Sequence, residues 1–581
     1  MRLLQALQAC GLRRLVLCPG SRSGPLAVAG GLLERHGLEL FTGVDERSAA
    51  FLALGLGRAD GHAAAVVTTS GTAVANLLPA AVEADHGAIA LLLLSADRPQ
   101  RLKGIGANQT VNQERFLEPS ARLALSADPR GLAAMAPAAL EALAQRAWAA
   151  AHAAPAGPVH LNLPLEEPLH ASVAELEQLA AAPPPPLPAP SPPPAAAVAT
   201  TAAHPPNPSP LDPQRPGAVV AGPWRGPLAQ LPAFADALTR WQGATGWPVL
   251  ADGLSGLRGT PGLRLIHSYD LLLEAGHGLP AAPQLLRLGP MPASRRLQQW
   301  IAGGGGPQLL ISEADPRNLD AAASASQRCG LGLARWLQAQ PPLPEAPSAV
   351  ATAWAEPWWR ADAAAQGQLD ALLAAGGGEP AIARALSRWL PPGLPVMLAS
   401  SSPVRDWESF AAADAPQRPL IGFRGASGID GTLSLAAGLA LGCGALVLVS
   451  GDLALLHDAN GWLWLRQLAQ RGVRLTVVLI DNGGGGIFEQ LPIRADGPLD
   501  FERLFAMPQA VDQLALAAAH GVPGRRLQDL AALPDALAWA LPQPLALVAL
   551  RTDRRADARL RQELRRRMAA LHGGPDGESA P

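Results

Sequence analysis

Oxygen-bearing side chains follow two neighbouring apolar runs in the last third of the chain, where strands are expected to end. The run 445–450 leads into Gly451-Asp452, and the run 475–480 leads into Asp481-Asn482 and four glycines. Open α/β sheets bind ligands at the carboxyl ends of their strands. The Asp452 carboxylate, the Asn482 amide oxygen and a carbonyl of the glycine loop suit Mg²⁺, and free N–H groups of that loop suit a diphosphate. These residues predict a magnesium–diphosphate site; a turn aspartate beside a flexible glycine loop is the alternative.

A second candidate, Glu46, lies far away in the sequence. It follows the strand-like segment 38–41 and opens an Ala/Leu-rich segment that is expected to be helical. Burial of a carboxyl group in an apolar pocket raises its pKa. A carboxyl group protonated in this way can take part in general acid–base chemistry on a bound cofactor. For an isolated glutamate, the simpler interpretation is an acid favoured by the dipole at a helix N-terminus.

The elements that must position these residues are short apolar strands that alternate with Ala/Leu-rich helices. Each strand candidate is a continuous run of Leu or β-branched residues, which is typical of parallel sheets covered on both faces. They fall into three groups, at Leu15–Cys18, Ala64–Thr69, Ile89–Ser95 and Val159–Leu163; at Ala218–Ala221, Val249–Ala251, Leu285–Leu288 and Leu309–Ser312; and at Val396–Ala399, Ala445–Ser450, Leu475–Ile480 and Leu545–Leu550. We therefore expect an α/β protein with three open, mainly parallel sheets.

Changes in composition set the expected domain boundaries. A proline-rich stretch cannot form helix or central strand and predicts a semi-rigid spacer, with a role as an SH3-type ligand as the alternative. The glycines 303–306 precede a strand and are interpreted as a loop, and the arginine-rich segment Arg554–Arg567 as a solvated terminal helix. The expected order is a first α/β domain at 1–182, the linker at 183–216, a central domain at 217–345, a diphosphate-binding domain at 376–556, and a C-terminal helix and tail at 557–581.

Composition and charge exclude several classes of partner and location. The 581 residues carry a net charge of −2, with 49% hydrophobic and 16% charged residues. This favours a globular protein with no nucleic acid or anionic membrane as partner. The four cysteines are scattered without metal-ligand spacing, which predicts free thiols in a reducing compartment and a cytoplasmic location. The apolar stretch 431–451 contains no charged residue. It includes several glycines and serines, which predicts a buried helix followed by a strand rather than a membrane span.

Motifs around the candidate residues resemble those of one family. Asp452 followed by Asn482 resembles the diphosphate signature of thiamine-diphosphate enzymes, with Leu453 where glycine is usual. Further motifs are similar to those of the 2-succinyl-5-enolpyruvyl-6-hydroxy-3-cyclohexene-1-carboxylate (SEPHCHC) synthases, thiamine enzymes of menaquinone and phylloquinone biosynthesis. They are CPGSRS from Cys18, DERSAAFLALGLGRA from Asp45, TTSGTAVANLLPA from Thr68, SADRP from Ser95, GANQT from Gly106, GPVHLNLP from Gly157, PVLADGLSGLR from Pro248, RGASGIDGTLS from Arg424, GDLALLHDANG from Gly451 and IFEQLP from Ile487.

The resemblance implies a reaction and its cofactors. Members of this family use thiamine diphosphate and Mg²⁺ or Mn²⁺ to decarboxylate 2-oxoglutarate, and they add the resulting succinyl carbanion equivalent to isochorismate in a Stetter-like 1,4-addition. It also implies a homodimer with shared active sites, or a homotetramer, because Glu46 and Asp452 belong to domains that meet across a subunit interface in this superfamily. Both substrates are dianions, so a site rich in arginine is expected.

Matched position by position, the resemblance also implies the site residues. Glu46 is the implied catalytic residue: a protonated glutamate beside the aminopyrimidine ring of thiamine favours the imino tautomer, which removes the C2 proton of the thiazolium ring. Asp452, Asn482 and Gly484 are the implied metal ligands. The cofactor would be bound by Glu46, Ser401, Ser427, Gly428, Ile429, Asp452, Asn482, Gly484 and Ile487, and the substrates by Ser21, Arg22, Arg98, Asn108, Gln109, Arg295, Arg296, Ser401, Arg405, Arg424, Phe488 and Leu491. Two positions depart from the family: Arg295 stands where lysine is frequent, with a different reach, and Phe423 where asparagine is frequent.

Two other functions remain alternatives. One is another thiamine-diphosphate enzyme, such as an acetolactate synthase or a 2-oxoacid decarboxylase; those enzymes lack the arginine and amide set of CPGSRS and GANQ. The other is a non-catalytic relic of the fold, which the intact Glu46, Asp452 and Asn482 disfavour.

Overall fold

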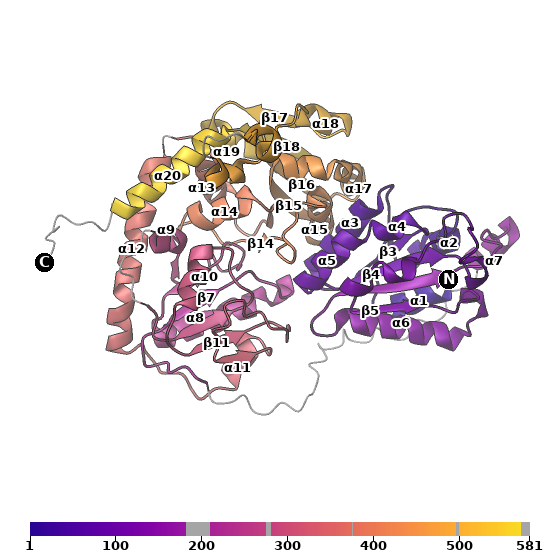
Figure 1. Cartoon of the computed structure of the whole chain (residues 1–581), viewed down its shortest axis with the longest axis horizontal. Coiled ribbons are helices and arrows are strands. Elements are labelled where there is room, and N and C mark those ends of the chain that lie inside the picture. The colour runs from indigo at the N-terminus through magenta and orange to yellow at the C-terminus, as the bar shows by residue number, and fades with distance from the viewer. Residues whose placement is uncertain (182–208, 275–280, 375, 495–498, 571–581) are drawn as a thin grey trace, which may run out of the picture. The chain divides into compact units, whose positions relative to one another are not determined.

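The computed structural model describes residues 1–181, 209–274, 281–374, 376–494 and 499–570. Most of the predicted linker and the end of the predicted tail lie outside these residues. Three six-stranded sheets, built from parallel strand pairs, confirm the predicted fold class (Figure 1). The chain separates into two compact units, which we call unit 1 (Met1–Thr201, Phe423–Gly444 and His457–Val473) and unit 2 (Ala202–Gly422, Ala445–Leu456 and Arg474–Pro581).

Unit 1 contains the first sheet, in the order β2-β1-β3-β4-β6-β5. Its strands are β1 (Arg14–Leu17), β2 (Glu39–Thr42), β3 (Ala64–Thr68), β4 (Leu91–Asp97), β5 (Leu123–Ser126) and β6 (Pro158–Pro164). Its helices are α1 (Arg2–Cys10), α2 (Gly24–Glu34), α3 (Glu46–Asp60), α4 (Thr72–Ala75), α5 (Leu78–Gly87), α6 (Pro137–His152), α7 (Val173–Ala181), α15 (Thr432–Cys443) and α17 (Leu465–Gln470).

The first sheet is buried on both faces. Every residue of β3, β4 and β6 is buried, which explains why these strands read as continuous apolar runs rather than as alternating ones. One face packs against α1, α2 and α6, while α3 contacts β1, β3 and β4. The sheet therefore holds α3, whose first residue is Glu46, in a fixed position.

Helices α3 and α15 cross at two glycines within unit 1. A Cβ added to Gly55 would lie 2.4 Å from the Leu435 carbonyl oxygen, and one added to Gly438 would lie 2.1 Å from the Leu52 oxygen. The missing side chains allow the two backbones to approach each other closely. This contact explains the small residues in both helical motifs, and it fixes α3 against the segment that precedes α15.

Unit 2 contains the second sheet, in the order β12-β11-β10-β7-β8-β9. If its strands are numbered 1 to 6 along the chain and read from β9 to β12, the order is 3-2-1-4-5-6, which is that of dinucleotide-binding folds. Its strands are β7 (Ala218–Ala221), β8 (Val249–Ala251), β9 (Leu265–Ile266), β10 (Leu285–Leu288), β11 (Gln308–Ile311) and β12 (Gln327–Cys329). Its helices are α8 (Leu231–Thr245), α9 (Tyr269–Glu274), α10 (Arg295–Ala302), α11 (Leu333–Gln338) and α12 (Ala349–Leu373).

The third sheet, also in unit 2, repeats the strand order of the first. Its order is β14-β13-β15-β16-β18-β17. The direction in which successive strands are added to the sheet reverses between β13 and β15, which is the switch point. The strands are β13 (Val396–Leu398), β14 (Leu420–Ile421), β15 (Ala445–Gly451), β16 (Arg474–Asp481), β17 (Gly524–Leu527) and β18 (Leu545–Arg551). The accompanying helices are α13 (Glu379–Trp389), α14 (Ser402–Phe410), α16 (Asp452–His457), α18 (Gln513–Ala519), α19 (Leu533–Ala540) and α20 (Arg554–Ala570). Ligands are expected at the carboxyl ends of strands at such a switch point.

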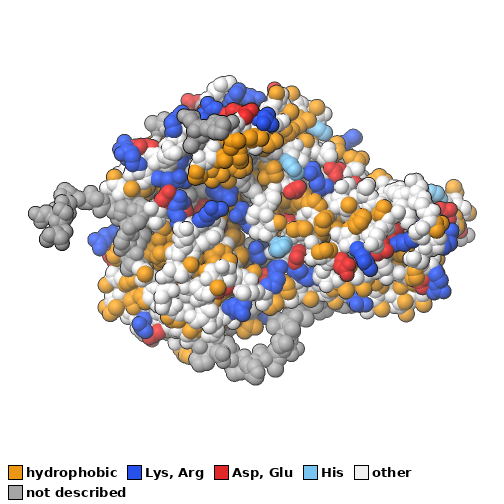
Figure 2. All heavy atoms as spheres, in the orientation of Figure 1, with side chains coloured by type: hydrophobic (Ala, Val, Ile, Leu, Met, Phe, Trp, Pro, Cys, Tyr) orange, Lys and Arg blue, Asp and Glu red, His pale blue; other side chains and the backbone are white. Residues whose placement is uncertain are grey.

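On the face seen in Figure 2, acidic and basic side chains are interspersed, and neither sign dominates. Within the described ranges, no helix combines the length and apolarity needed to cross a membrane. The apolar stretch 431–451 forms α15 and β15, as predicted.

Candidate active site

The predicted metal ligands of unit 2 converge on one backbone N–H group. Asp452 follows β15, and Asn482 follows β16, the neighbouring strand. The Gly484 N–H donates to Asp452 Oδ2 (2.8 Å) and to Asn482 Oδ1 (3.1 Å). The Leu453 N–H donates to the other Asp452 oxygen at 2.8 Å. The two side-chain oxygens are thus brought together at the carboxyl ends of β15 and β16, next to the switch point of the third sheet.

The electrostatics of Asp452 fit a bound cation. The pKa of Asp452 is raised to about 6, chiefly by burial; two backbone N–H donors oppose this shift, and the negative charges of Asp481 and Glu379 add to it. A divalent cation would supply the positive charge that this buried carboxylate lacks. The oxygen donors suit Mg²⁺ or Mn²⁺. Among the described residues, no three His, Cys, Asp or Glu side chains cluster as metal ligands, because this donor set contains only one ionisable group.

Glycine is required at position 484 for two reasons. Its φ of 123° lies in the region that side chains disfavour, and an added Cβ would lie 2.1 Å from the Ala506 carbonyl oxygen. The next residue, Gly485, donates its N–H to the same oxygen at 2.6 Å. The 482–486 turn is therefore packed tightly against the π-helical segment Glu502–Ala506.

The other predicted residues of unit 2 lie around the same sheet and beside the second one. Ser401 lies after β13 with a positive φ of 78°, and its carbonyl accepts a hydrogen bond from Arg405 Nη1 at 2.7 Å. The apolar residues Ile487 and Phe488 lie in the 3₁₀ turn Gly486–Gln490, and Leu491 follows with 46% exposure. At the start of α10, Arg295 is exposed, whereas Arg296 pairs with Asp270 (3.0 Å) and Glu274 (2.7 Å).

In unit 1, Glu46 is the first residue of α3. Asp45 caps the helix by accepting the N–H groups of Arg47 (2.9 Å) and Ser48 (3.3 Å). Glu46 Oε2 accepts a hydrogen bond from Asn76 Nδ2 at 3.2 Å. The glutamate is half-buried rather than enclosed within its own unit.

A buried polar network fixes the start of α3 relative to α15. Ser48 Oγ lies 2.7 Å from Ser434 Oγ and accepts a hydrogen bond from Trp464 Nε1 at 2.7 Å. The Ser434 N–H donates to Asp458 Oδ2 at 2.7 Å. The position of Glu46 is thus set by side chains from three separate stretches of sequence.

The loop before α15 carries Arg424, Ser427, Gly428 and Ile429. Glu83 of α5 holds this loop from the side: its two carboxylate oxygens accept the N–H groups of Gly425 and Ala426, each at 2.7 Å. Ser427 has a positive φ of 62°. Glu83 thus fixes the geometry of this loop, although it was not predicted as a site residue from the sequence.

Two predicted arginines converge in unit 1. Arg22, only 7% exposed, donates to the Leu165 carbonyl (2.9 Å) and lies 3.3 Å from Glu167. Arg98 Nη1 donates to Ser70 Oγ (2.6 Å) and to the Gln109 carbonyl (2.7 Å). Burial lowers the pKa of Arg98, and the positive charge of Arg22 lowers it further. An anionic substrate would relieve this repulsion.

The amide motif lies next to these arginines. Gln109 Nε2 donates to the Ser70 carbonyl at 2.7 Å, while Asn108 and Ser21 are exposed. Ser70 therefore connects Arg98 and Gln109, although it was not selected from the sequence. Its signal was available, since it lies within the motif that begins at Thr68, as does Asn76.

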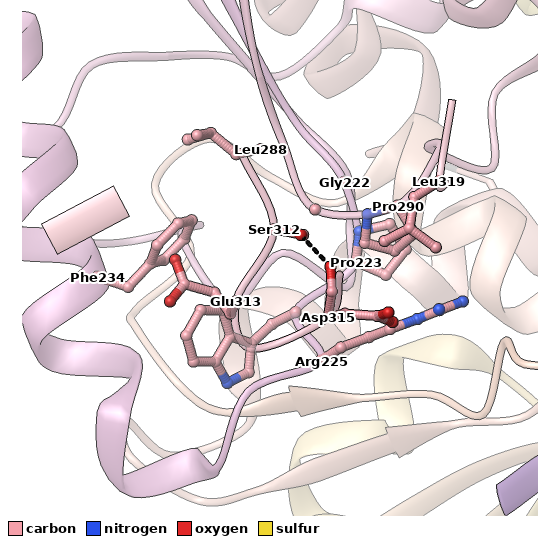
Figure 3. A pocket seen from close by; sticks show the side chains of 12 residues that line it. Gly222, Pro223, Arg225, Phe234, Leu288, Pro290, Ser312, Glu313, Asp315 and Leu319 are labelled. Atoms are coloured by element: carbon pink, nitrogen blue, oxygen red, sulfur yellow. Dashed lines mark hydrogen bonds between the residues drawn. The ribbon is translucent and has the colours of Figure 1, made fainter. Parts of the chain in front are cut away.

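The second sheet has a small pocket at its own switch point, lined mainly by residues that follow β7, β10 and β11 (Figure 3). None of the predicted site residues lines it. A Cβ on Gly222 would lie 1.8 Å from the Pro290 carbonyl oxygen, so the two loops at the switch point are in backbone contact. The turn after β7 also contains Pro223 and Pro227, which have no N–H group to offer a phosphate.

The repeated strand order and the switch-point site define a class of enzyme, and comparisons with known families agree. Residues 2–116 match the thiamine pyrophosphate enzyme N-terminal TPP binding domain, 213–395 the middle domain of thiamine pyrophosphate, and 408–549 the thiamine pyrophosphate enzyme C-terminal TPP binding domain. A solved benzoylformate decarboxylase from Polynucleobacter necessarius superposes with a TM-score of 0.65, covering 95% of this chain and 98% of that one at 16% identity, which shows the shared fold. The chain has the fold and domains of a thiamine pyrophosphate enzyme.

Curated relatives narrow the class to one family. The chain is 56% identical to the 2-succinyl-5-enolpyruvyl-6-hydroxy-3-cyclohexene-1-carboxylate synthase of Synechococcus sp. (strain RCC307), over 97% of this chain and 96% of the relative. It is 53% identical to the synthase of the same name from Prochlorococcus marinus (strain MIT 9313), over 96% and 97%. The chain belongs to the SEPHCHC synthase family.

Proposed function

We propose that the protein catalyses the thiamine-diphosphate-dependent decarboxylation of 2-oxoglutarate and the 1,4-addition of the succinyl unit to isochorismate. The products are SEPHCHC and CO₂, in menaquinone or phylloquinone biosynthesis. The observation that carries this proposal is the near-full-length identity of 56% to a curated SEPHCHC synthase. The paired arginines of unit 1 support it, because both substrates are dianions.

We infer separate roles for the residues of the two units. Thiamine diphosphate, when bound, supplies the electron sink for decarboxylation and for formation of the new carbon–carbon bond. Asp452, Asn482 and the Gly484 carbonyl would hold Mg²⁺ or Mn²⁺, whose positive charge would favour binding of the diphosphate. Glu46 holds a proton beside the aminopyrimidine ring, which is general acid–base chemistry worth about 10²–10⁴ in rate. Its contact with Asn76 is the support for this placement, because the amide orients the carboxyl group.

The arginines provide charge complementarity. Arg22 and Arg98 meet carboxylates of the substrates; burial lowers the pKa of Arg98, and the positive charge of Arg22 lowers it further, so an anion beside both would be favoured. Apolar side chains of Ile487, Phe488 and Leu491 exclude water from the reacting carbon. Phe488 is braced by an edge-on contact with Phe505, with ring centroids 5.9 Å apart.

We also infer the assembly and the location. Glu46 of one subunit and Asp452 of its partner complete each site in a homodimer, as the family resemblance implies, and dimers can pair into tetramers. All four cysteines are free thiols, which supports residence in the reducing cytoplasm.

Product analysis tests the activity directly. The purified protein is incubated with thiamine diphosphate, Mg²⁺ and 2-oxoglutarate, with and without isochorismate, and products are followed by mass spectrometry. We expect SEPHCHC only when isochorismate is present. Succinic semialdehyde as the sole product in both reactions would instead identify a simple 2-oxoacid decarboxylase.

The role of Glu46 is tested with Glu46→Gln and a matched control, Glu34→Gln. Glu34 is an exposed residue at the end of α2. We expect kcat to fall by about 10²-fold or more in Glu46→Gln and to stay unchanged in the control. Unchanged turnover in Glu46→Gln would refute the proton-holding role.

A further inference from the structure

The C-terminal helix α20 directs three arginines into unit 2. Arg554, Arg561 and Arg565 are seven and four residues apart, so they share one face of the helix. The neighbouring Arg555, by contrast, is 48% exposed. The prediction of a solvated terminal helix is therefore wrong for this face. Two apolar residues, Leu564 and Met568, are fully buried and dock the helix against α12.

Arg554 contacts the turn that carries the predicted metal ligands. Its Nη1 donates to the Gly483 carbonyl at 2.8 Å. Its Nε donates to Glu489 Oε1 at 2.7 Å, and its Nη2 contacts Glu502. One guanidinium thus joins the start of the turn to the 3₁₀ turn that follows it and to the π-helical segment beneath it.

Arg561 acts on the same turn through Glu379, the first residue of α13. Its guanidinium forms ion pairs with Glu379 and with Asp406, the latter at 2.7 Å. The other oxygen of Glu379 accepts a hydrogen bond from Asn482 Nδ2. All four side chains are at least nine-tenths buried. Charge-assisted hydrogen bonds in such surroundings are stronger than neutral ones.

These contacts determine which groups of the turn face the cofactor. Because the Asn482 amide nitrogen is bonded to Glu379, its oxygen must point to the opposite side, towards the Gly484 N–H and Asp452. The Gly483 carbonyl points towards Arg554, which bonds it, whereas the Gly484 carbonyl accepts the Gly486 N–H at 2.8 Å and keeps its second lone pair for a ligand. Both choices are those that the predicted metal site requires.

We propose that Arg554 and Arg561 are positioning residues, which hold the 482–484 turn in its cofactor-binding geometry before the metal and thiamine diphosphate arrive. The identity of the cofactor rests on the proposed function. The order of the turn in the cofactor-free protein does not depend on that identity. Each arginine acts through another group, Gly483 or Glu379, and neither touches the reacting atoms.

The test compares Arg554→Gln with Arg555→Gln. Arg555 lies next to Arg554 on α20 and pairs with the same carboxylate, Glu502, so its substitution removes an equal charge without touching Gly483. The first readout is hydrogen–deuterium exchange of the amides 483–486 in the cofactor-free protein. The second is the Kd of thiamine diphosphate at fixed Mg²⁺, from tryptophan fluorescence. We expect Arg554→Gln to speed exchange and to raise the Kd by about tenfold or more, the factor for one charge-assisted hydrogen bond.

Arg554→Lys separates charge from geometry. Lysine keeps the charge but cannot reach three oxygens with a fixed fork, so we expect an intermediate Kd with the same thermal midpoint as wild type. If Arg554→Gln does not fold, Arg554→Lys decides the outcome alone. Exchange rates and Kd values equal to those of Arg555→Gln would overturn the proposal. If the wild type itself does not bind thiamine diphosphate, the proposed function fails, and the exchange of the turn still decides this inference.

Discussion

The sharpest prediction of the structure concerns Glu83, which holds the loop before α15 in unit 1. Its carboxylate is 5% exposed, and its two oxygens accept the N–H groups of Gly425 and Ala426, each at 2.7 Å. The perturbation is Glu83→Gln, which keeps the size and shape of the side chain. Glutamine has one acceptor oxygen, so its NH₂ group must face one of the two backbone donors.

The magnitude follows from the two hydrogen bonds. A hydrogen bond to a charged group contributes about 1.5–3 kcal/mol, and a buried N–H left without a partner costs about 1–3 kcal/mol. The loop cannot relax towards α5, because a Cβ on Gly425 would already lie 2.7 Å from the Gly87 nitrogen. We therefore expect the free energy of local opening of residues 423–431 to fall by about 2–4 kcal/mol.

Hydrogen–deuterium exchange of the cofactor-free protein is the suitable assay, because a chain with several domains need not unfold in a single step. Amides 425–430 should exchange about 30-fold to 1,000-fold faster in Glu83→Gln, at about 1.4 kcal/mol per tenfold change. The control is Glu34→Gln, for which we expect a change within about 0.5 kcal/mol, as for other exposed sites. Equal protection of these amides in both variants would refute the role of the Glu83 carboxylate.

Three further predictions concern buried titratable groups. Burial, with the negative charges of Glu46 and Asp45, raises the pKa of Cys18 to about 12. Cys18 should therefore be the slowest of the four thiols to react with iodoacetamide at pH 8, and peptide mass spectrometry that finds it alkylated first would contradict this. Burial lowers the pKa of His160 from 6.5 to about 4, so the unfolded chain binds the extra proton and stability should fall by about 3 kcal/mol as the pH drops from 6.5 to 4. His160→Gln should remove that part of the slope in acid denaturation, and an unchanged slope would count against it. Asp452 is the one ionisable member of the predicted metal-ligand set, so Asp452→Asn should raise the Kd of thiamine diphosphate with Mg²⁺ about 10²-fold; titration calorimetry that finds an unchanged Kd would refute the metal-site assignment.

The central strands of all three sheets could be predicted from the sequence; of the edge strands only β2, which overlaps the strand-like segment 38–41, could be. The four inner strands of each sheet are continuous apolar runs because both of their faces are buried. The outer strands β5, β12 and β17 are half-buried or exposed, and β9 and β14 have two residues each. A strand that is short or half-exposed lacks the apolar pattern, and it is defined by pairing with a distant neighbour instead.

The candidate site shows a similar division. Asp452 and Asn482 could be selected from the residues alone, because each follows an apolar run at a strand end, and Glu46 could be selected from its place before a helix. The substrate arginines required the family resemblance. Nothing local distinguishes Arg22 from Arg58, another buried arginine, before the fold brings Arg22 close to Arg98.

The side chains that the sequence could not reveal share one physical task. Glu83 accepts two N–H groups from a loop more than 300 residues away, and Arg554 donates to a carbonyl 71 residues away. Both loops are turns whose backbone groups have few partners within the turn, and a buried loop with unpaired groups is unstable. The Glu83 carboxylate accepts N–H groups that converge on it, and the Arg554 guanidinium donates to a carbonyl that points out of its turn. Each side chain thus pairs backbone groups from outside the turn. Because each contact fixes a loop and not the core, its loss should weaken cofactor binding more than it lowers the global stability of the fold.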